Sequence, residues 1–283
     1  MKVVTAVVNN PQFIEIQYHT LKQYMPCDYE FIVFNDAKDF PDMTNGGDIS
    51  IKQQIEDMCK KHSILYINIP NEHHQYNKVP SARTADSMNF IKHFQMQFPD
   101  EYLLLDSDMC LIAPIDIEKY RQYECAVVLQ HRNMHHHDIY YFWNGLYYFD
   151  TTKMQDLHIL EWDMIQGCDT GGKTCIWYIN HLRKNPGETI PDMENLKSHV
   201  SKTIYYITHK SSGKWDENDA PDCIKTNKGL LQFLKENPRN ENNKFFCELY
   251  DNCLLHYRAG GNWMGEGHDF HINLAKNLKD AIV

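Results

Sequence analysis

The sequence of 283 residues has no long hydrophobic run and no low-complexity segment. Its apolar runs are far shorter than the roughly 18–20 residues that a membrane-spanning helix needs, which argues against a membrane span. The N-terminal MKVVTAVVNN contains only a short apolar run that stops at Asn9-Asn10-Pro11. We therefore expect a first strand there rather than a signal peptide.

Basic residues are fewer than acidic ones, and the cysteines show no metal-site or disulfide spacing. The formal net charge is −10, which disfavours a general nucleic-acid binder but still allows a nucleotide ligand. The nine cysteines are odd in number and include no Cys-x-x-Cys. This pattern predicts reduced, mostly buried thiols rather than a disulfide framework or a structural zinc site, and it points to a reducing cytoplasm.

Strands and helices alternate in the first part of the chain. The hydrophobic pattern predicts strands over residues 3–8, 29–34 and 64–69, and helices over residues 11–24, 48–61 and 81–98. Ser81 is expected to cap the third of these helices. Such alternation predicts an α/β fold with a mostly parallel sheet, in which ligands bind beyond the carboxyl ends of the strands.

The later part is less regular. We expect strands over residues 125–130, 142–149 and 253–257, helices over 152–166, 173–184 and 270–281, and a polar, histidine-rich loop over 131–141. No internal repeat or linker is evident, so a single domain over residues 1–283 is predicted. The histidines at 131 and 135–137 suit either a mobile loop or a metal or proton-relay cluster.

The stretch EYLLLDSDMCLIAP places Asp106 and Asp108 between two apolar runs. Two buried carboxylates would each cost several kcal/mol unless they were paired or bound to metal, and the stretch contains no Lys or Arg. Both oxygens therefore belong at a cleft, where they suit Mn²⁺ or Mg²⁺. The alternative is an ordinary solvated turn.

A second pattern is LLHYRAGGNW, in which His256 ends a short apolar strand and a glycine pair follows it. Imidazole is a good ligand for Mn²⁺, and glycines let backbone amides approach phosphate closely. A lone buried histidine is otherwise an ordinary core residue. Here it would supply the third ligand that Asp106 and Asp108 require.

These motifs together resemble those of GT-A glycosyltransferases, which bind a nucleotide-sugar through an Asp-x-Asp motif and a metal. The glycogenin-like type closes the metal site with a late His-aromatic…Gly…Trp segment, similar to the one ending at Trp263 here. Phe142-Trp143-Asn144-Gly145 and Cys168-Asp169-Thr170-Gly171-Gly172 match two further motifs in order and spacing. The residues of the Asp169-Thr170-Gly171-Gly172 segment and of the segment from His256 to Trp263 are most similar to those of glycosyltransferases of large algal viruses.

The resemblance implies a single GT-A domain, with a nucleotide-sugar half at 1–113 and an acceptor half at 114–283. It implies Asp106, Asp108 and His256 as ligands of Mn²⁺ or Mg²⁺. It assigns nucleotide-sugar contacts to Val8, Asn9, Asp36, Arg83, Asp86, Asp106, Ser107, Asp108, Asn144, Gly145, Gly260, Gly261 and Trp263.

The resemblance also places Asp169 at a helix start near the reacting centre, as base or positioning group. The activity implied is transfer of a sugar from a nucleoside diphosphate-sugar, expected to be a UDP-sugar, to a glycan or glycoprotein hydroxyl. Trp143 replaces a small residue of the family, and Thr170 stands where retaining members have Gln. Donor sugar and stereochemistry therefore stay open.

Two other interpretations remain. A lectin-like module would bind sugar through a metal without turnover. A haloacid-dehalogenase-like phosphatase also uses a strand followed by Asp-x-Asp, but that strand normally opens its domain and a Thr or Val follows the second Asp. Here three predicted strands and three predicted helices precede the motif, and Met109 follows it.

Overall fold

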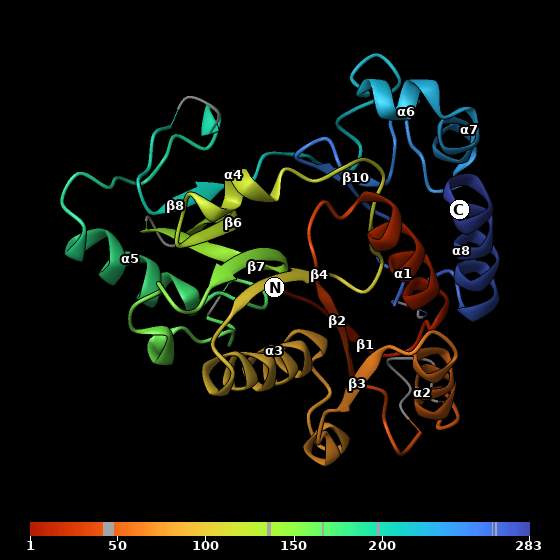
Figure 1. The fold of residues 1–283 in the computed structure, drawn as a ribbon, viewed down its shortest axis with the longest axis horizontal. Coiled ribbons are helices and arrows are strands. Elements are labelled where there is room, and N and C mark those ends of the chain that lie inside the picture. Colours follow the sequence, from red (N-terminus) through yellow and green to blue (C-terminus); the bar gives the residue numbers. More distant parts are fainter. Residues whose placement is uncertain (42–47, 135–136, 166, 197–198, 262, 264) are drawn as a thin grey trace. The chain divides into compact units, whose positions relative to one another are not determined.

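The first part of the chain alternates strands and helices, as the hydrophobic pattern predicts (Figure 1). The computed structural model describes residues 1–41, 48–134, 137–165, 167–196, 199–261, 263 and 265–283. The elements are β1 (Lys2–Val7), α1 (Gln12–Tyr24), β2 (Glu30–Asn35), α2 (Ile51–Lys61), β3 (Leu65–Asn68), a 3₁₀ helix (Glu72–Gln75), α3 (Pro80–Gln97), β4 (Glu101–Leu105) and β5 (Met109–Leu111).

The later part adds shorter elements. They are α4 (Ile117–Arg121), β6 (Cys125–Met134), β7 (His137–Asp150), a 3₁₀ helix (Leu157–Ile159), α5 (Thr174–Lys184), β8 (Ile204–Tyr206), β9 (His209–Lys210), α6 (Asp222–Thr226), α7 (Lys228–Glu236), β10 (Glu248–Tyr250), β11 (Leu254–His256) and α8 (His268–Ile282).

Seven strands form a mostly parallel sheet in the order β3-β2-β1-β4-β7-β6-β8. The pairs β2–β3, β1–β4 and β6–β8 are parallel, and β6 and β7 are antiparallel. A smaller antiparallel sheet has the order β5-β11-β10-β9. The predicted α/β class with a mostly parallel sheet is confirmed.

The chain divides into two compact units, each built from three separate segments. The first unit comprises Met1–Val4, Asn71–Leu104 and Ile117–Thr208. The second comprises Thr5–Pro70, Leu105–Asp116 and His209–Val283. The predicted single domain, with halves at 1–113 and 114–283, stays a prediction.

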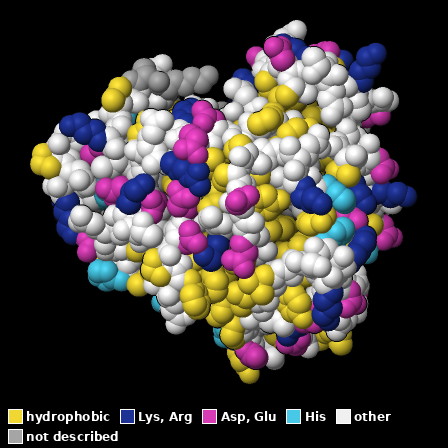
Figure 2. Space-filling model, in the orientation of Figure 1, with side chains coloured by type: hydrophobic (Ala, Val, Ile, Leu, Met, Phe, Trp, Pro, Cys, Tyr) yellow, Lys and Arg dark blue, Asp and Glu magenta, His cyan; other side chains and the backbone are white. Residues whose placement is uncertain are grey.

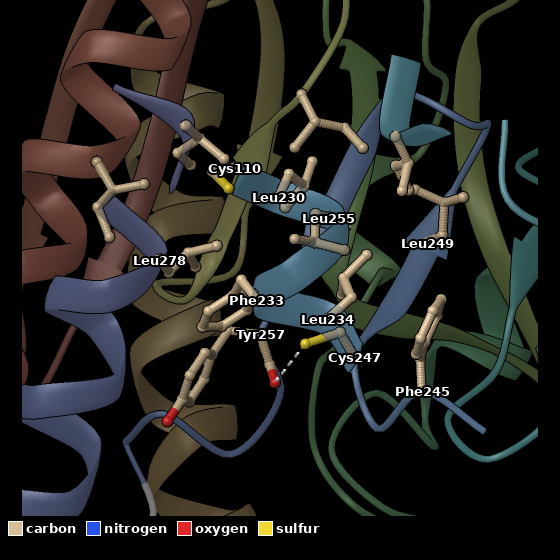
Figure 3. Close-up of a cluster of buried hydrophobic side chains, with 14 of the residues drawn as sticks. Cys110, Leu230, Phe233, Leu234, Phe245, Cys247, Leu249, Leu255, Tyr257 and Leu278 are labelled. Carbon is tan, nitrogen blue, oxygen red and sulfur yellow. Dashed lines mark hydrogen bonds between the residues drawn. The ribbon is translucent and has the colours of Figure 1, made fainter. Parts of the chain in front are cut away.

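The second unit has a core in which the smaller sheet packs with helices (Figure 3). Leu249 and Leu255 come from the β10–β11 hairpin, and Leu230, Leu234 and Leu278 come from α7 and α8. All five are buried, and each such side chain contributes about 1.5–3 kcal/mol relative to exposure. This core fixes the hairpin that carries His256.

In the first unit, the C-terminal end of β7 is buried. Its Tyr147 and Phe149 rings stack at 4.0 Å, and Trp162 stacks on Tyr147 at 5.2 Å. Gln95 of α3 donates a hydrogen bond to the Tyr147 hydroxyl at 3.1 Å, which satisfies a polar atom inside this core. The aromatic content of the strand therefore serves packing.

Helix α3 begins one residue earlier than predicted. It starts at Pro80, after Val79, and no side chain caps it. Proline is favoured in the first turn of a helix because its φ is already fixed and its missing N–H is not needed there. The expectation that Ser81 caps this helix is therefore wrong.

The predicted loop over residues 131–141 is mostly strand. β6 and β7 continue their pairing through His131↔Tyr140 and Asn133↔Asp138. The His131 and Tyr140 rings stack at 4.7 Å, and His131 Nε2 lies 2.7 Å from Asp138 Oδ1. Alternating polar residues on an exposed hairpin gave no apolar signal, which is why sequence pattern missed it. Residues 135 and 136 lie outside the described residues.

No long helix forms between residues 152 and 165. Asp150 accepts hydrogen bonds from both the N–H and the hydroxyl of Thr152, and Asp156 adopts a left-handed φ of 55°. These local contacts compete with a helix, so only the short 3₁₀ turn Leu157–Ile159 remains. Helical spacing of apolar residues therefore misled the prediction over 152–166, whose last residue is not described.

The nine cysteines are all free thiols, and seven of them are buried. The prediction that the thiols are mostly buried is confirmed, and their reduced state stays a prediction. Within the described residues, none of the helices combines the length and the apolar character required for crossing a membrane. On the face drawn in Figure 2, Lys and Arg side chains lie among Asp and Glu side chains.

Candidate metal centre

The Asp-Ser-Asp segment forms a tight turn between β4 and β5. The Met109 N–H donates to the Asp106 carbonyl at 3.0 Å, and the Ser107 N–H donates to Asp106 Oδ1 at 2.7 Å. Gln17 of α1 donates through Nε2 to the carbonyls of Asp106 and Met109, at 2.8 and 2.9 Å. The backbone of the turn is thus held by its own hydrogen bonds and by the Gln17 side chain.

His256 ends β11 beside this turn. Strand pairing sets His256 opposite Met109, and its Nε2 lies 3.0 Å from Asp108 Oδ1 and 3.6 Å from Asp106 Oδ2. Asp108 and His256 are nearly buried, whereas the Asp106 side chain stays 35% exposed. The three predicted ligands therefore converge, with one carboxylate open to solvent.

The electrostatics of the group are those of a cation site that holds a proton. Burial opposes charge on His256, but the Asp108 carboxylate, Glu248 and Asp106 raise its pKa to about 10. Burial and the neighbouring Asp108 carboxylate raise the pKa of Asp106 to about 6. Although burial acts against it, the charge of His256 holds the pKa of Asp108 below its usual value.

The donor set fits a divalent cation. Each of the three residues offers one ligand atom, and these atoms lie within 4.8 Å of one another. Two carboxylate oxygens and one imidazole nitrogen suit Mn²⁺, whereas Mg²⁺ prefers oxygen alone. The cation would take the place of the proton on His256 Nε2, because a ligating imidazole must release that proton.

A strained turn follows His256 and returns the chain to Asp108. Arg258 and Ala259 both have left-handed backbones, with φ of 68° and 59°. The Gly260 N–H then donates to Asp108 Oδ2 at 2.7 Å. A Cβ on Gly260 would lie 2.7 Å from the Phe13 ring and 2.9 Å from Asp108 Cβ, so only glycine fits there.

The strained turn is held by Arg239, which sequence inspection did not single out. Its guanidinium donates to the carbonyls of Tyr257 and Arg258, at 3.1 and 2.7 Å, and lies over the Tyr257 ring at 4.0 Å. Backbone strain of this kind persists only where surrounding contacts fix it, and it gathers at functional sites.

Residues after β1 and β2 belong to the same unit as the metal group. Asn9 is buried, and its Nδ2 donates to the Gly261 carbonyl at 2.6 Å, whereas Val8 is half-buried. Asp36 is buried, and the ammonium of Lys38 lies 3.3 Å from its Oδ1. Sequence inspection did not single out Lys38 as the partner of Asp36.

Trp263 is a predicted sugar-facing residue that the structure buries. Its side chain is nearly inaccessible, and its ring meets that of His268 edge-on at 4.3 Å. The predicted role for Trp263 in binding a nucleotide-sugar stays a prediction.

The remaining predicted residues belong to the first unit. Arg83 is buried on α3, where it donates to the carbonyls of Asn77 and His74 at 2.6 and 3.1 Å. Asp86 Oδ2 lies 2.7 Å from His73 Nε2. Both side chains thus anchor the segment before α3, whatever else they bind.

Asn144 and Gly145 lie in β7, and Asp169 lies in the turn before α5. A Cβ on Gly145 would lie 2.3 Å from the Trp143 ring, so this glycine makes room for that tryptophan. Asp169 is exposed and accepts a hydrogen bond from the Thr170 N–H at 2.8 Å. Helix α5 begins only at Thr174, so Asp169 does not cap it and the expected helix start is wrong.

Glu248 is the most informative residue that sequence inspection missed. It lies opposite His256 in the β10–β11 hairpin, and its Oε2 is 3.1 Å from His256 Nδ1. A signal was present, because Asp251 and Asn252 favour the left-handed turn that they adopt, with φ of 42° and 58°. A two-strand pairing built on that turn would have placed Glu248 beside His256.

Two other side-chain groups in the described ranges could hold a metal. One is Glu15, His19 and His62, but Glu15 already pairs with Lys61 and with Lys279 of α8, each at 2.7 Å. The other is His73, His74 and Asp86, in which His73 pairs directly with Asp86. The Asp106 group differs because two carboxylates share one imidazole.

Comparison with known proteins gives structural matches only. No protein-family model matches the sequence, and no curated protein matches it. The galactosyltransferase LgtC, in complex with donor and acceptor sugar analogs, is 12% identical; the match covers 77% of this chain and 91% of that chain, with a TM-score of 0.44. An active-site mutant of LgtC is 10% identical; the match covers 80% of this chain and 93% of that chain, with a TM-score of 0.44.

The apo structure of the bifunctional glycosyltransferase WbbM is also similar. It is 10% identical, and the match covers 56% of this chain and 33% of that chain with a TM-score of 0.35. At these scores the similarities by themselves assign neither a family nor an activity to this chain.

Proposed function

We propose that the chain is a metal-dependent glycosyltransferase. It moves a sugar from a nucleoside diphosphate-sugar, expected to be a UDP-sugar, to a hydroxyl of a glycan or glycoprotein. The observation that supports this most directly is the convergence of Asp106, Asp108 and His256 at the turn after β4. The order of the other motifs in the sequence supports the same activity.

In this proposal, Asp106, Asp108 and His256 hold Mn²⁺ or Mg²⁺, with Mn²⁺ preferred because of the imidazole. The bound cation supplies positive charge that offsets the charge developing on the diphosphate leaving group. Asp106 is the ligand open to solvent, so the substrate approaches the group from its side. The Gly260–Gly261 backbone lets the diphosphate approach closely.

Other residues bind the donor and acceptor. Val8, Asn9 and Asp36 contact the nucleoside, Arg83 and Asp86 contact the diphosphate and sugar, and Ser107, Asn144, Gly145 and Trp263 complete the donor contacts. Asp169 takes the proton of the acceptor hydroxyl if the transfer inverts the anomeric centre, and positions the substrate if it retains it. These roles rest on the sequence motifs.

The setting is part of the proposal. Nine free thiols suit a reducing cytoplasm. A viral origin is proposed only from the residues of the Asp169 and His256 motifs.

The test is a thermal-shift screen of nucleoside diphosphates and nucleotide-sugars with and without Mn²⁺. We expect stabilisation that requires both nucleotide and Mn²⁺, and its loss in Asp106→Asn, Asp108→Asn and His256→Ala. Loss of one ligand lowers metal affinity by at least about 10–100-fold. Asp57→Asn, on an exposed face of α2, is the control and should behave as the parent.

Three outcomes contradict the proposal. Equal nucleotide binding by the parent and all three ligand variants would mean that the site is elsewhere. Stabilisation by free sugar and metal, with no response to nucleotide, would indicate a lectin-like module. Release of inorganic phosphate from a phosphomonoester would indicate the phosphatase.

A further inference from the structure

The β10–β11 hairpin presents a carboxylate to the back of the His256 ring. The register sets Glu248 directly opposite His256, with Leu249 opposite Leu255 and Tyr250 opposite Leu254. Because Leu249 and Leu255 are buried in the core of the second unit, slippage of this register would expose both. The pairing of Glu248 with His256 is thus fixed by the packing of other residues.

The two nitrogens of the His256 ring face different partners. Nδ1 lies 3.1 Å from Glu248 Oε2, whereas Nε2 lies 3.0 Å from Asp108 Oδ1 and 3.6 Å from Asp106 Oδ2. The ring therefore bridges Glu248 on one side and the two predicted metal ligands on the other.

Glu248 is itself held in place. The Tyr250 hydroxyl donates to Oε2 at 2.9 Å, and the Ser212 N–H donates to Oε1 at 3.4 Å. The Arg258 guanidinium lies 3.7 Å from Oε1, and only 15% of the Glu248 side chain is exposed. The carboxylate thus needs no reordering before it acts on His256.

We propose that Glu248 is the positioning residue of the metal centre, fixing His256 so that Nδ1 carries the ring proton and Nε2 binds the cation. This rests on the proposed function, and it adds a residue outside the Asp-x-Asp and His-Tyr motifs. A neutral imidazole keeps one proton, and an acceptor at Nδ1 selects the form whose lone pair is on Nε2. A carboxylate acceptor also makes that lone pair a stronger donor to the cation.

Tyr250 acts one step further out. Its hydroxyl binds the same Oε2 atom that faces His256, so it orients the carboxylate rather than the ring. Loss of this hydroxyl leaves Glu248 with the Ser212 and Arg258 contacts. The effect of Tyr250→Phe on metal binding should therefore have the same sign as that of Glu248→Ala and a smaller size.

The experiment measures Mn²⁺ affinity by calorimetry, with free Mn²⁺ counted by electron paramagnetic resonance, without nucleotide. Glu248→Ala should weaken Mn²⁺ binding by about 10–100-fold. Glu248→Gln should recover part of the loss, because its amide oxygen still accepts from Nδ1 but carries no charge. Glu217→Gln, an exposed glutamate that pairs with Lys235, is the matched control and should bind as the parent does.

A second readout reports the ring itself. NMR of isotope-labelled histidine in the Zn²⁺-loaded protein should show His256 with its proton on Nδ1 in the parent and in Glu248→Gln. In Glu248→Ala that proton should exchange rapidly with water or the metal should bind through either nitrogen. Circular dichroism and thermal unfolding establish whether each variant is folded. If Glu248→Ala does not fold, Glu248→Gln serves as the test variant, because it keeps the side-chain volume.

The outcomes separate the two proposals. If the parent binds Mn²⁺ and folded Glu248→Ala binds it equally well with the same ring form, the role of Glu248 is wrong and the metal site stands. The same holds if folded Glu248→Gln loses as much affinity as an Ala variant of His256 itself. If the parent binds no divalent cation, both proposals fail together.

Discussion

The imidazole of His256 and the carboxylate of Asp108 are joined through their backbones as well as their side chains. Nε2 of His256 lies 3.0 Å from Asp108 Oδ1, and the N–H of Tyr257 donates to the Asp108 carbonyl at 2.9 Å. Strands β5 and β11 pair from Leu111↔Leu254 to Met109↔His256 just before this point. The meeting of the two side chains is therefore a result of strand pairing.

The first prediction concerns pH and stability without metal. The pKa of His256 is raised from 6.5 to about 10, and that of Asp106 from 3.8 to about 6, so both groups hold a proton more tightly in the folded state. Their contributions are complete below the unfolded values and are lost as pH rises through the folded ones. The part of the unfolding free energy in EDTA that these two groups contribute should thus fall from about pH 4 towards pH 10.

Saturating Mn²⁺ replaces these protons, so the stabilisation that it gives should grow with pH. Denaturant unfolding between pH 6 and pH 8.5, in EDTA and in Mn²⁺, measures both curves. His256→Gln should flatten the metal-free curve and remove most of the difference. A metal-free stability difference between the parent and His256→Gln that grows with pH in this range would refute the proton-holding interpretation.

A second prediction compares the two adjacent glycines. Gly260→Ala forces a Cβ to within 2.7 Å of the Phe13 ring and 2.9 Å of Asp108 Cβ. Such overpacking costs about 1–3 kcal/mol and shifts the N–H that caps Asp108, so Mn²⁺ affinity should fall with stability. In Gly261→Ala the nearest atom is Asn9 Oδ1 at 3.3 Å, and the effect should be markedly smaller. If the two substitutions had equal effects, both on unfolding and on Mn²⁺ titration, this prediction would be wrong.

A third prediction concerns Arg83. Its guanidinium binds the carbonyls of His74 and Asn77, so Arg83→Ala should cost about 1–3 kcal/mol of stability by leaving buried acceptors unsatisfied. It should also weaken binding of the nucleotide-sugar. Arg83→Lys should restore only part of the stability and of the donor affinity, since an ammonium cannot reproduce the forked N–H groups of a guanidinium. Normal donor affinity in a folded Ala variant would leave Arg83 with the structural role alone.

The fourth prediction concerns Asp169. Asp169→Asn should leave Mn²⁺ and donor affinity nearly unchanged while transfer falls by about 10²–10⁴-fold, the usual contribution of a general base. Asp156→Asn is a suitable control, because Asp156 has a left-handed φ that asparagine also adopts readily. The anomeric configuration of the product then separates a base from a positioning group. Full turnover in Asp169→Asn would remove both roles.

Sequence pattern was sufficient where burial was continuous along a strand. Val3, Val4 and Val7 are all fully buried, and such β-branched runs identify parallel strands in this fold. The same logic placed two carboxylates at the end of a strand, because an unpaired charge cannot remain inside a core. The part of the site that depends on residues adjacent in sequence, a strand followed by two carboxylates, was therefore predictable.

What escaped prediction depends on partners distant in sequence. Nothing near Gln17 or Arg239 indicates that they hold the Asp-Ser-Asp turn and the strained turn. The hairpin through residues 131–141 was missed because exposed strands lack an apolar run. The helix expected over 152–166 failed because apolar spacing does not report competing side-chain hydrogen bonds.

The interleaving of the two units has a consequence for synthesis on the ribosome. All segments of the first unit have been translated once Thr208 is made, whereas the second unit still lacks His209–Val283. Until then Asp106 and Asp108 have no imidazole between them, and their mutual repulsion opposes closure of that unit. A nascent chain that has emerged from the ribosome only as far as residue 208 therefore has every segment of the first unit and an unfinished metal centre.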